Sequence, residues 1–332
     1  MKFLSLLYSV ILSAGLLSCD SLISTVPEDK LPQGAGKLVL HSYISPQDTL
    51  ILVKITLSNP LLGIQPNSGY TYTVVGQDTI YQTNVPVANA KVSISNSKRQ
   101  SAELPYSKTQ QVYLLSTKSF PILAGETYTI KASAPMGNIE AACTVPKDAA
   151  SIVKYKIDTL TDFRVNPARI TFRINFDWKD IPGQENFYTM KAEIKAPMIL
   201  TPFPDNKSQT TLIRTISYTS YWDEENRQEQ YQTDASRDGQ LLSTPNGIIT
   251  PGTEAVAENN QRYYTRYAGK KSIIRLEILN TDKNYFNYHR AVRINNRQDG
   301  NPFVEPVPIP TNIKNGLGCF AASNKSVLIF TF

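Results

Sequence analysis

Hydrophobic and polar residues alternate with a period of two in many short runs along this chain. The clearest run is Ile170–Phe176, in which every second residue is isoleucine or phenylalanine and the residues between them are polar. This pattern is typical of a β-strand with one face against a core and the other toward water. Turn-forming residues separate such runs at the spacing found in β-sandwiches, which predicts an all-β protein.

The predicted strands fall into two groups, on either side of the polar segment Pro146–Ser151. The first group comprises Leu38–Ile44, Leu50–Leu57, Tyr70–Val75, Thr79–Thr83, Lys91–Ser95, Gln111–Ser116, Thr127–Ser133 and Ile139–Val145. The second comprises Ile152–Thr159, Arg169–Trp178, Phe187–Ala196, Leu212–Tyr218, Ser272–Asn280 and Ser326–Phe332. Because Pro146 ends a strand and the segment after it is polar, we predict two domains, residues 37–146 and 147–332.

The segment Leu123–Ile130 in the first domain resembles the tyrosine corner of immunoglobulin-like and fibronectin-like sandwiches. In that corner a tyrosine hydroxyl bonds to the backbone a few residues upstream, and Tyr128 stands at the matching place. The first domain is therefore predicted to be an immunoglobulin-like or fibronectin-like β-sandwich. The alternative is a surface turn followed by a strand in which Tyr128 packs on one face, which leaves the all-β prediction intact.

Two segments depart from the β pattern. Thr281–Val292 places Tyr285, Tyr288 and Val292 at i, i+3 and i+7 behind a Thr or Asp cap, which predicts one short helix in the second, β-rich domain. The polar, charged stretch Tyr221–Gln240 is predicted to be a long loop or hairpin. Its two aromatic residues, Tyr221 and Trp222, are candidate ligand contacts, although both residue types also suit paired strands.

The N-terminus has the pattern of an export signal. Lys2 precedes the apolar run Phe3–Leu17, which is shorter than the roughly 20 residues of a permanent membrane span. The run ends at Leu16-Leu17-Ser18-Cys19, which resembles a lipobox. We predict that residues 1–18 are a signal peptide, that Cys19 becomes the lipidated N-terminus, and that residues 19–36 form a tether. The alternative is an ordinary secretory signal with an incidental cysteine.

Composition and charge exclude several classes of protein. A hydrophobic content of 41% is enough for a full core and argues against disorder. The net charge of +6 is scattered without a basic tract, so no nucleic-acid partner is expected. Cys143 and Cys319 either bridge the two domains or remain as two buried thiols, and the sequence leaves both alternatives open.

No zinc-protease histidine pair, phosphate loop, dinucleotide fingerprint or nucleophile elbow is present, so we predict no catalytic residue, no cofactor and no metal site. Asp223–Glu225 and Asp234–Asp238 contain the residue types of a glycosidase or a calcium site, but without the spacing of a calcium loop. A solvated acidic loop is the favoured interpretation. His41 and His289 are expected to be structural, and Gly316–Gly318 is expected to form a turn.

Five segments resemble one family. They are Lys37–Pro46, Gly125–Tyr128, Tyr285–Tyr288, Asn301–Pro306 and Thr311–Phe320. Together they are similar to a family of Bacteroidota lipoproteins known as domain-of-unknown-function family 4249, and the similarity spans nearly the whole region after the tether. We interpret residues 312–320 as a structural motif, in which glycine and asparagine form a tight turn and Phe320 enters the core. Cys319 stands where an aliphatic residue is expected, which argues against a family disulfide.

The resemblance implies an outer-membrane lipoprotein without catalytic residues. Such proteins are commonly encoded beside a TonB-dependent receptor, so the expected role is a non-enzymatic accessory to that β-barrel receptor in nutrient capture or uptake. The cell surface is favoured over the periplasmic face. One alternative is a free-standing surface protein that binds glycans or peptides through the Tyr221 loop. Another is a hydrolase that uses its acidic residues.

Four triplets resemble the Asp-Ser/Thr-aliphatic acceptor used for O-glycosylation of exported proteins in the same phylum. One is Asp20-Ser21-Leu22, directly after Cys19, and the other three contain threonine. The threonines concerned are Thr49, Thr79 and Thr159, each preceded by aspartate and followed by leucine or isoleucine. Strands that begin with Asp-Thr would also produce several such triplets without any modification. O-glycosylation of these residues is therefore a hypothesis.

Overall fold

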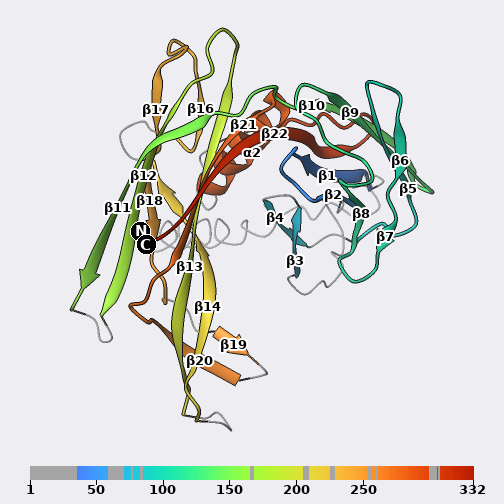
Figure 1. Cartoon of the computed structure of the whole chain (residues 1–332). Helices are drawn as coiled ribbons and strands as arrows, with labels where there is room; N and C mark the ends of the chain where they lie inside the picture. The colour runs from blue at the N-terminus through green and yellow to red at the C-terminus, as the bar shows by residue number, and fades with distance from the viewer. Residues whose placement is uncertain are drawn as a thin grey trace, which may run out of the picture.

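The computed structural model describes residues 36–58, 71–75, 78–82, 85–164, 168–204, 209–224, 229–252, 256–258, 261–298, 305 and 307–332. This part of the chain is mostly β-structure arranged in several sheets, as the sequence predicted (Figure 1). It includes one α-helix, α2 (Lys283–Gln298). No helix within the described ranges combines the length and apolarity needed to cross a membrane.

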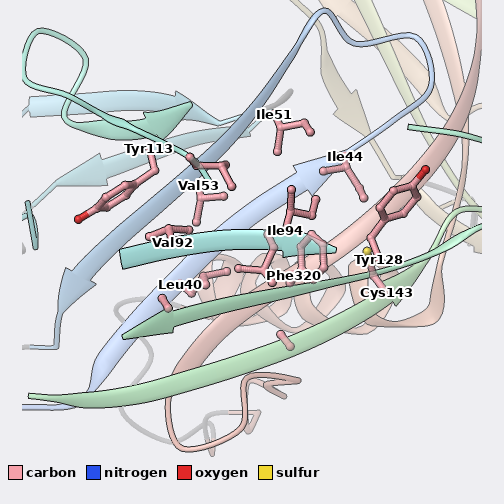
Figure 2. Packing of buried hydrophobic residues seen from close by; sticks show 14 of the residues in the cluster. Leu40, Ile44, Ile51, Val53, Val92, Ile94, Tyr113, Tyr128, Cys143 and Phe320 are labelled. Carbon is pink, nitrogen blue, oxygen red and sulfur yellow. The ribbon is translucent and has the colours of Figure 1, made fainter. Parts of the chain in front are cut away.

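The first region forms a β-sandwich. Its strands are β1 (Leu38–Ile44), β2 (Leu50–Leu57), β3 (Thr71–Val75), β4 (Asp78–Gln82), β5 (Lys91–Asn96), β6 (Ser101–Glu103), β7 (Tyr106–Ser107), β8 (Val112–Ser116), β9 (Thr127–Ala134) and β10 (Gly137–Thr144). The sheet β10-β9-β5-β6 packs on the strands β1-β2-β8-β7. Figure 2 shows Leu40, Val53 and Ile94 from these two layers packed together, and all three are fully buried.

Tyr128 forms the predicted tyrosine corner. Its hydroxyl accepts a hydrogen bond of 2.7 Å from the backbone N–H of Leu123 and donates one of 3.1 Å to the carbonyl of Pro121. The ring is fully buried in the first core. The corner therefore satisfies two backbone groups of the loop before β9 while the ring contributes to the core.

A second sandwich follows. Its strands are β11 (Ser151–Asp162), β12 (Arg169–Lys179), β13 (Phe187–Pro202), β14 (Leu212–Thr219), β15 (Tyr221–Asp223), β16 (Tyr231–Thr233), β17 (Leu241–Ser243), β18 (Asn246–Ile249), β19 (Val256–Glu258), β20 (Gln261–Tyr267), β21 (Ile273–Thr281) and β22 (Leu317–Thr331). One layer is β11-β12-β18-β15, with β17 beside β12, and the other is centred on β13 and β21. Phe172, Phe176 and Trp178 from one layer pack on Tyr188 and Ile274 from the other.

Strand β22 belongs to both regions. Residues 317–322 pair parallel with β1, and residues 323–331 pair antiparallel with β21. In Figure 1 its dark red ribbon runs from the left-hand group of strands to the right-hand group. The prediction of a turn at Gly316–Gly318 is therefore wrong for its last two residues. Leu317 and Gly318 already belong to the strand, which starts nine residues before the predicted Ser326 because β1 offers it a partner.

The motif at residues 312–320 is structural, as expected. The side-chain amide of Asn312 donates a hydrogen bond to the carbonyl of Phe320, and its oxygen accepts one from the Phe320 N–H. Asn315 has a φ of 61°, which turns the chain, and Phe320 is fully buried in the first core (Figure 2). The asparagine thus anchors the start of β22, and the phenylalanine fills the sandwich.

The segment between the two regions is bound to β22. Asn324 donates hydrogen bonds to the carbonyls of Pro146 and Lys147, at 3.1 and 3.2 Å, and accepts one from the side chain of Gln47. The ammonium of Lys325 contacts Asp48 at 2.8 Å. The division into domains 37–146 and 147–332 stays a prediction, because one continuous sheet contains strands from both.

Candidate functional site

Helix α2 is held against β22 by its N-terminal cap. Asp282 accepts a hydrogen bond of 2.8 Å from the N–H of Tyr285 and another of 3.2 Å from the N–H of Ala322 in β22. Burial raises the pKa of Asp282 to about 7. The helix starts where the sequence predicted and extends six residues past Val292, because its C-terminal half has ion-pair partners described below.

The two histidines of the chain lie in one aromatic layer between α2 and the sheet. His41 Nε2 is 2.8 Å from the hydroxyl of Tyr288. The ring of His289 packs against Tyr43 and Tyr285, at centroid distances of 4.9 and 4.2 Å. Through these contacts both histidines hold the helix against the sheet, which agrees with the structural role expected for them.

Three arginines on one side of α2 bind the segment between β15 and β16. Arg293 and Arg297 both pair with Glu224, the former at 2.8 Å, and Arg290 pairs with Glu229 at 3.1 Å. The side chain of Glu224 is only 6% exposed. Glu224 is therefore used to hold the helix and is not presented in a solvated loop, which corrects the interpretation of the first acidic stretch. Glu225 lies outside the described residues.

A cavity of about 440 Å³ opens beside this helix. Its lining includes Phe286 and Arg290 of α2, Tyr231 of β16, Leu241 of β17, and Arg237 from the loop between those strands. The volume falls within the range of small-molecule sites. Tyr231 and Phe286 offer apolar walls, with their rings 6.2 Å apart.

The charged groups of the cavity favour an anionic ligand. Arg290 is paired with Glu229, whereas Arg237 is exposed and its guanidinium donates a hydrogen bond to the carbonyl of Thr233. Two guanidinium groups and one carboxylate leave an excess of positive charge at the opening. A guanidinium fork recognises a carboxylate or a phosphate in two parallel hydrogen bonds. The arrangement is suited to binding, and its lining contains no histidine that would activate Ser243 as a nucleophile.

The two candidate ligand contacts on β15 have different environments. Tyr221 is 62% exposed and available to a ligand, whereas Trp222 is 2% exposed and packs against Phe176 in the second core. The prediction of a ligand contact is therefore corrected for Trp222, which is a core residue because alternation along β15 directs neighbouring side chains to opposite faces. A ligand at Tyr221 stays a prediction.

The other predicted sites have these locations. Cys19, the signal peptide at residues 1–18 and all but residue 36 of the tether lie outside the described residues. Thr49 and Thr159 are exposed, so both are accessible to a modifying enzyme. Thr79 lies in β4.

Cys143 and Cys319 are buried and are not joined by a disulfide in this structure, so of the two alternatives it shows the pair of buried thiols. Cys143 belongs to the first sandwich core, whereas Cys319 belongs to the layer beneath α2 and faces Asn284. The two side chains occupy different hydrophobic clusters on either side of β22.

Sequence reasoning missed the cavity and its arginines. The signal for the helix side was present, because Arg290, Arg293 and Arg297 follow the i, i+3, i+7 spacing of one helix face. Their partners are 61 to 73 residues earlier in the chain, and no local pattern connects them.

Of the comparisons with known proteins, one identifies a family. No curated protein matches the sequence. Among solved structures, the chain is compared with one described as a biofilm associated protein, BSP domain, at 5% identity and a TM-score of 0.15. That alignment covers 89% of this chain and 58% of the other, so the chain spans less than two thirds of that structure, and the score is too low to indicate a shared fold. The family model "Domain of unknown function (DUF4249)" matches residues 25–328, and the chain therefore belongs to this family.

Proposed function

We propose that this protein is an exported, lipid-anchored lipoprotein that binds a small anionic ligand in the cavity beside α2. The observation that carries the proposal is the placement of Arg237 and Arg290 around an aromatic-walled cavity of about 440 Å³. A site of this size with few charged groups at fixed positions is typical of ligand recognition. The protein acts by binding and is not an enzyme.

The N-terminal pattern supports the anchored location. A lipid on Cys19 places the folded body at a membrane surface, and the tether that follows gives it reach. We propose the outer membrane of a Bacteroidota host, with the surface favoured over the periplasmic face. The partner is a TonB-dependent β-barrel receptor, which this protein assists in capturing or importing a nutrient.

The receptor is tested by a native pull-down from detergent-solubilised outer membranes, with a tag at the exposed C-terminal residue Phe332. Stoichiometric recovery of a TonB-dependent receptor supports the proposal. Recovery of the protein without a β-barrel, after crosslinking and mild extraction, contradicts the accessory role.

The cavity is tested separately, by thermal shift with amino acids, short peptides and sugar acids. Arg290→Gln and Arg237→Gln are expected to weaken binding of any carboxylate ligand by at least about tenfold. Arg173→Gln, on the exposed face of β12, serves as the control and retains affinity. Equal affinity in all three variants would exclude the cavity as the binding site.

A second candidate function, favoured by the exposed ring of Tyr221, is a free-standing surface binder of glycans or peptides. Aromatic rings stack on sugar faces and anchor peptides. A Tyr221→Ala variant that retains all binding in a glycan and peptide screen would argue against this function.

A further inference from the structure

Three aspartates meet at one end of the second sandwich. Asp180 follows β12, whereas Asp234 and Asp238 belong to the loop between β16 and β17, more than fifty residues later in the chain. One carboxylate oxygen from each can be chosen so that all three lie within 4.8 Å of one another. Asp180 and Asp234 are 2% and 6% exposed, and Asp238 is exposed.

Two of these carboxylates are oriented by neighbouring donors. Asp180 accepts hydrogen bonds from the hydroxyl of Tyr188, at 2.8 Å, and from the N–H of Gly239, at 2.7 Å. Asp238 accepts one of 2.8 Å from the N–H of Gly183. Such outer hydrogen bonds hold the oxygens in place and leave further lone pairs available.

Asp234 is different. Its backbone bonds to Asn186 and Arg237, but within the described residues its carboxylate makes no hydrogen bond and no ion pair, although the residue is 94% buried. The carboxylate of Asp234 instead lies close to the carboxylates of Asp180 and Asp238. The carboxylate keeps slight contact with solvent, and the repulsion from two further carboxylates nearby is relieved if a cation lies between the three.

No basic side chain in the described ranges neutralises the group. Arg237 is the nearest in sequence, and its guanidinium donates to the carbonyl of Thr233 instead. Three converging carboxylates, one of them 94% buried and without a protein partner among the described residues, are suited to binding a cation. We propose that Asp180, Asp234 and Asp238 bind a calcium ion.

Calcium fits this oxygen set better than other common cations. Ca²⁺ lies about 2.3–2.6 Å from its ligands, so two oxygens that share one ion lie within about 5.2 Å of each other. The three oxygens of this cluster meet that condition. Zinc prefers histidine and cysteine, which the cluster lacks. Magnesium requires shorter distances and nearly ideal octahedral geometry. Exposed Asp238 leaves one side open for water to complete the coordination.

The ion would connect two loops and the wall of the cavity. The loop from Asp234 to Gly239 also carries Arg237, which lines the cavity. Calcium would therefore fix the position of a residue on which the proposed ligand site depends. The metal site itself rests only on the three aspartates and stands whether or not the cavity binds a ligand.

The test uses the full chain, freed of metal by a chelator and then titrated with Ca²⁺ by calorimetry and by thermal unfolding. We expect saturable binding and a rise in Tm. Terbium(III) provides a second readout, because Tyr188 donates to Asp180 and its ring lies 5.6 Å from Trp178, so both rings can sensitise the bound ion.

Asp234→Asn keeps the shape and removes the unpartnered charge, so it should weaken Ca²⁺ binding at least about tenfold and abolish the rise in Tm. Asp238→Asn, at an exposed position, should do the same without risk to folding, and its amide oxygen retains the bond from Gly183. Asp158→Asn on exposed β11 is the control. Absence of saturable binding at millimolar Ca²⁺, or unchanged affinity in folded Asp234→Asn and Asp238→Asn, overturns the proposal.

Discussion

Gly318 of β22 lies directly opposite Leu40 of β1, in the parallel pairing that joins the two halves of the protein. The backbone at Gly318 has a φ of +102°, and a methyl group added there would overlap the carbonyl oxygen of Leu40. Only glycine allows the two strands to approach this closely. The position therefore decides whether β22 can complete the first sandwich.

Gly318→Ala is expected to destabilise the protein by about 3 kcal/mol or more, because it combines steric overlap with an unfavourable φ. Chemical denaturation provides the measurement. Gly269→Ala is the matched control, since Gly269 has a φ of +65° with open space around it and should cost only about 1–2 kcal/mol. Equal losses in the two variants would mean that the contact with Leu40 is unimportant.

Tyr128→Phe should cost about 1–2 kcal/mol, because it leaves the N–H of Leu123 and the carbonyl of Pro121 without their partner. The ring would still fill the core, so the fold should persist. Tyr221→Phe, at an exposed position, should leave the free energy of unfolding unchanged. A neutral Tyr128→Phe variant would show that the corner contributes only through its ring.

The raised pKa of Asp282 leads us to expect that the free energy of unfolding depends on pH. Its pKa is about 7 in the folded protein and 3.8 in the reference state, so between these values the folded chain retains a proton that the unfolded chain loses. The stability that Asp282 contributes by keeping its proton is complete below about pH 4 and lost above about pH 7. Between these values the free energy of unfolding falls by up to about 1.4 kcal/mol per pH unit as the pH rises. Asp282→Asn should show a flatter profile. The same slope in both proteins would rule out titration of Asp282.

Glu224→Gln should destabilise the protein by about 2 kcal/mol, because two arginines lose a buried carboxylate. Glu229→Gln is the control. Its pair with Arg290 is about half exposed, which limits the expected loss to less than about 1 kcal/mol. Both values come from urea denaturation, and a larger effect at Glu229 would contradict this ranking.

Burial raises the pKa of the Cys143 thiol well above its usual range, which lowers its reactivity. We expect Cys143 and Cys319 to resist a thiol reagent in the folded protein and to react together once it is unfolded. Mass spectrometry without a reductant provides the test. A disulfide between them in the native protein would contradict the two buried thiols of this structure.

Much of the local structure could be predicted because it depends on neighbouring residues. The alternation in Ile170–Phe176 predicted β12, the residues around Tyr128 predicted the corner, and the spacing of Tyr285 and Tyr288 predicted the start of α2. The all-β fold follows from the sum of such patterns. The prediction that Cys19 is lipidated likewise depends on the sequence alone.

Tertiary structure decided what depends on distant residues. Gly318 belongs to a strand because β1 pairs with it, and Trp222 is buried because β15 pairs with β18. Glu224 is covered by arginines of α2. The proposed calcium ligands follow the same rule. Asp180 meets Asp234 and Asp238 only when β12 and β17 pair. Alternation and turn residues act over a few positions, whereas strand pairing and buried charge compensation join residues that no local pattern relates.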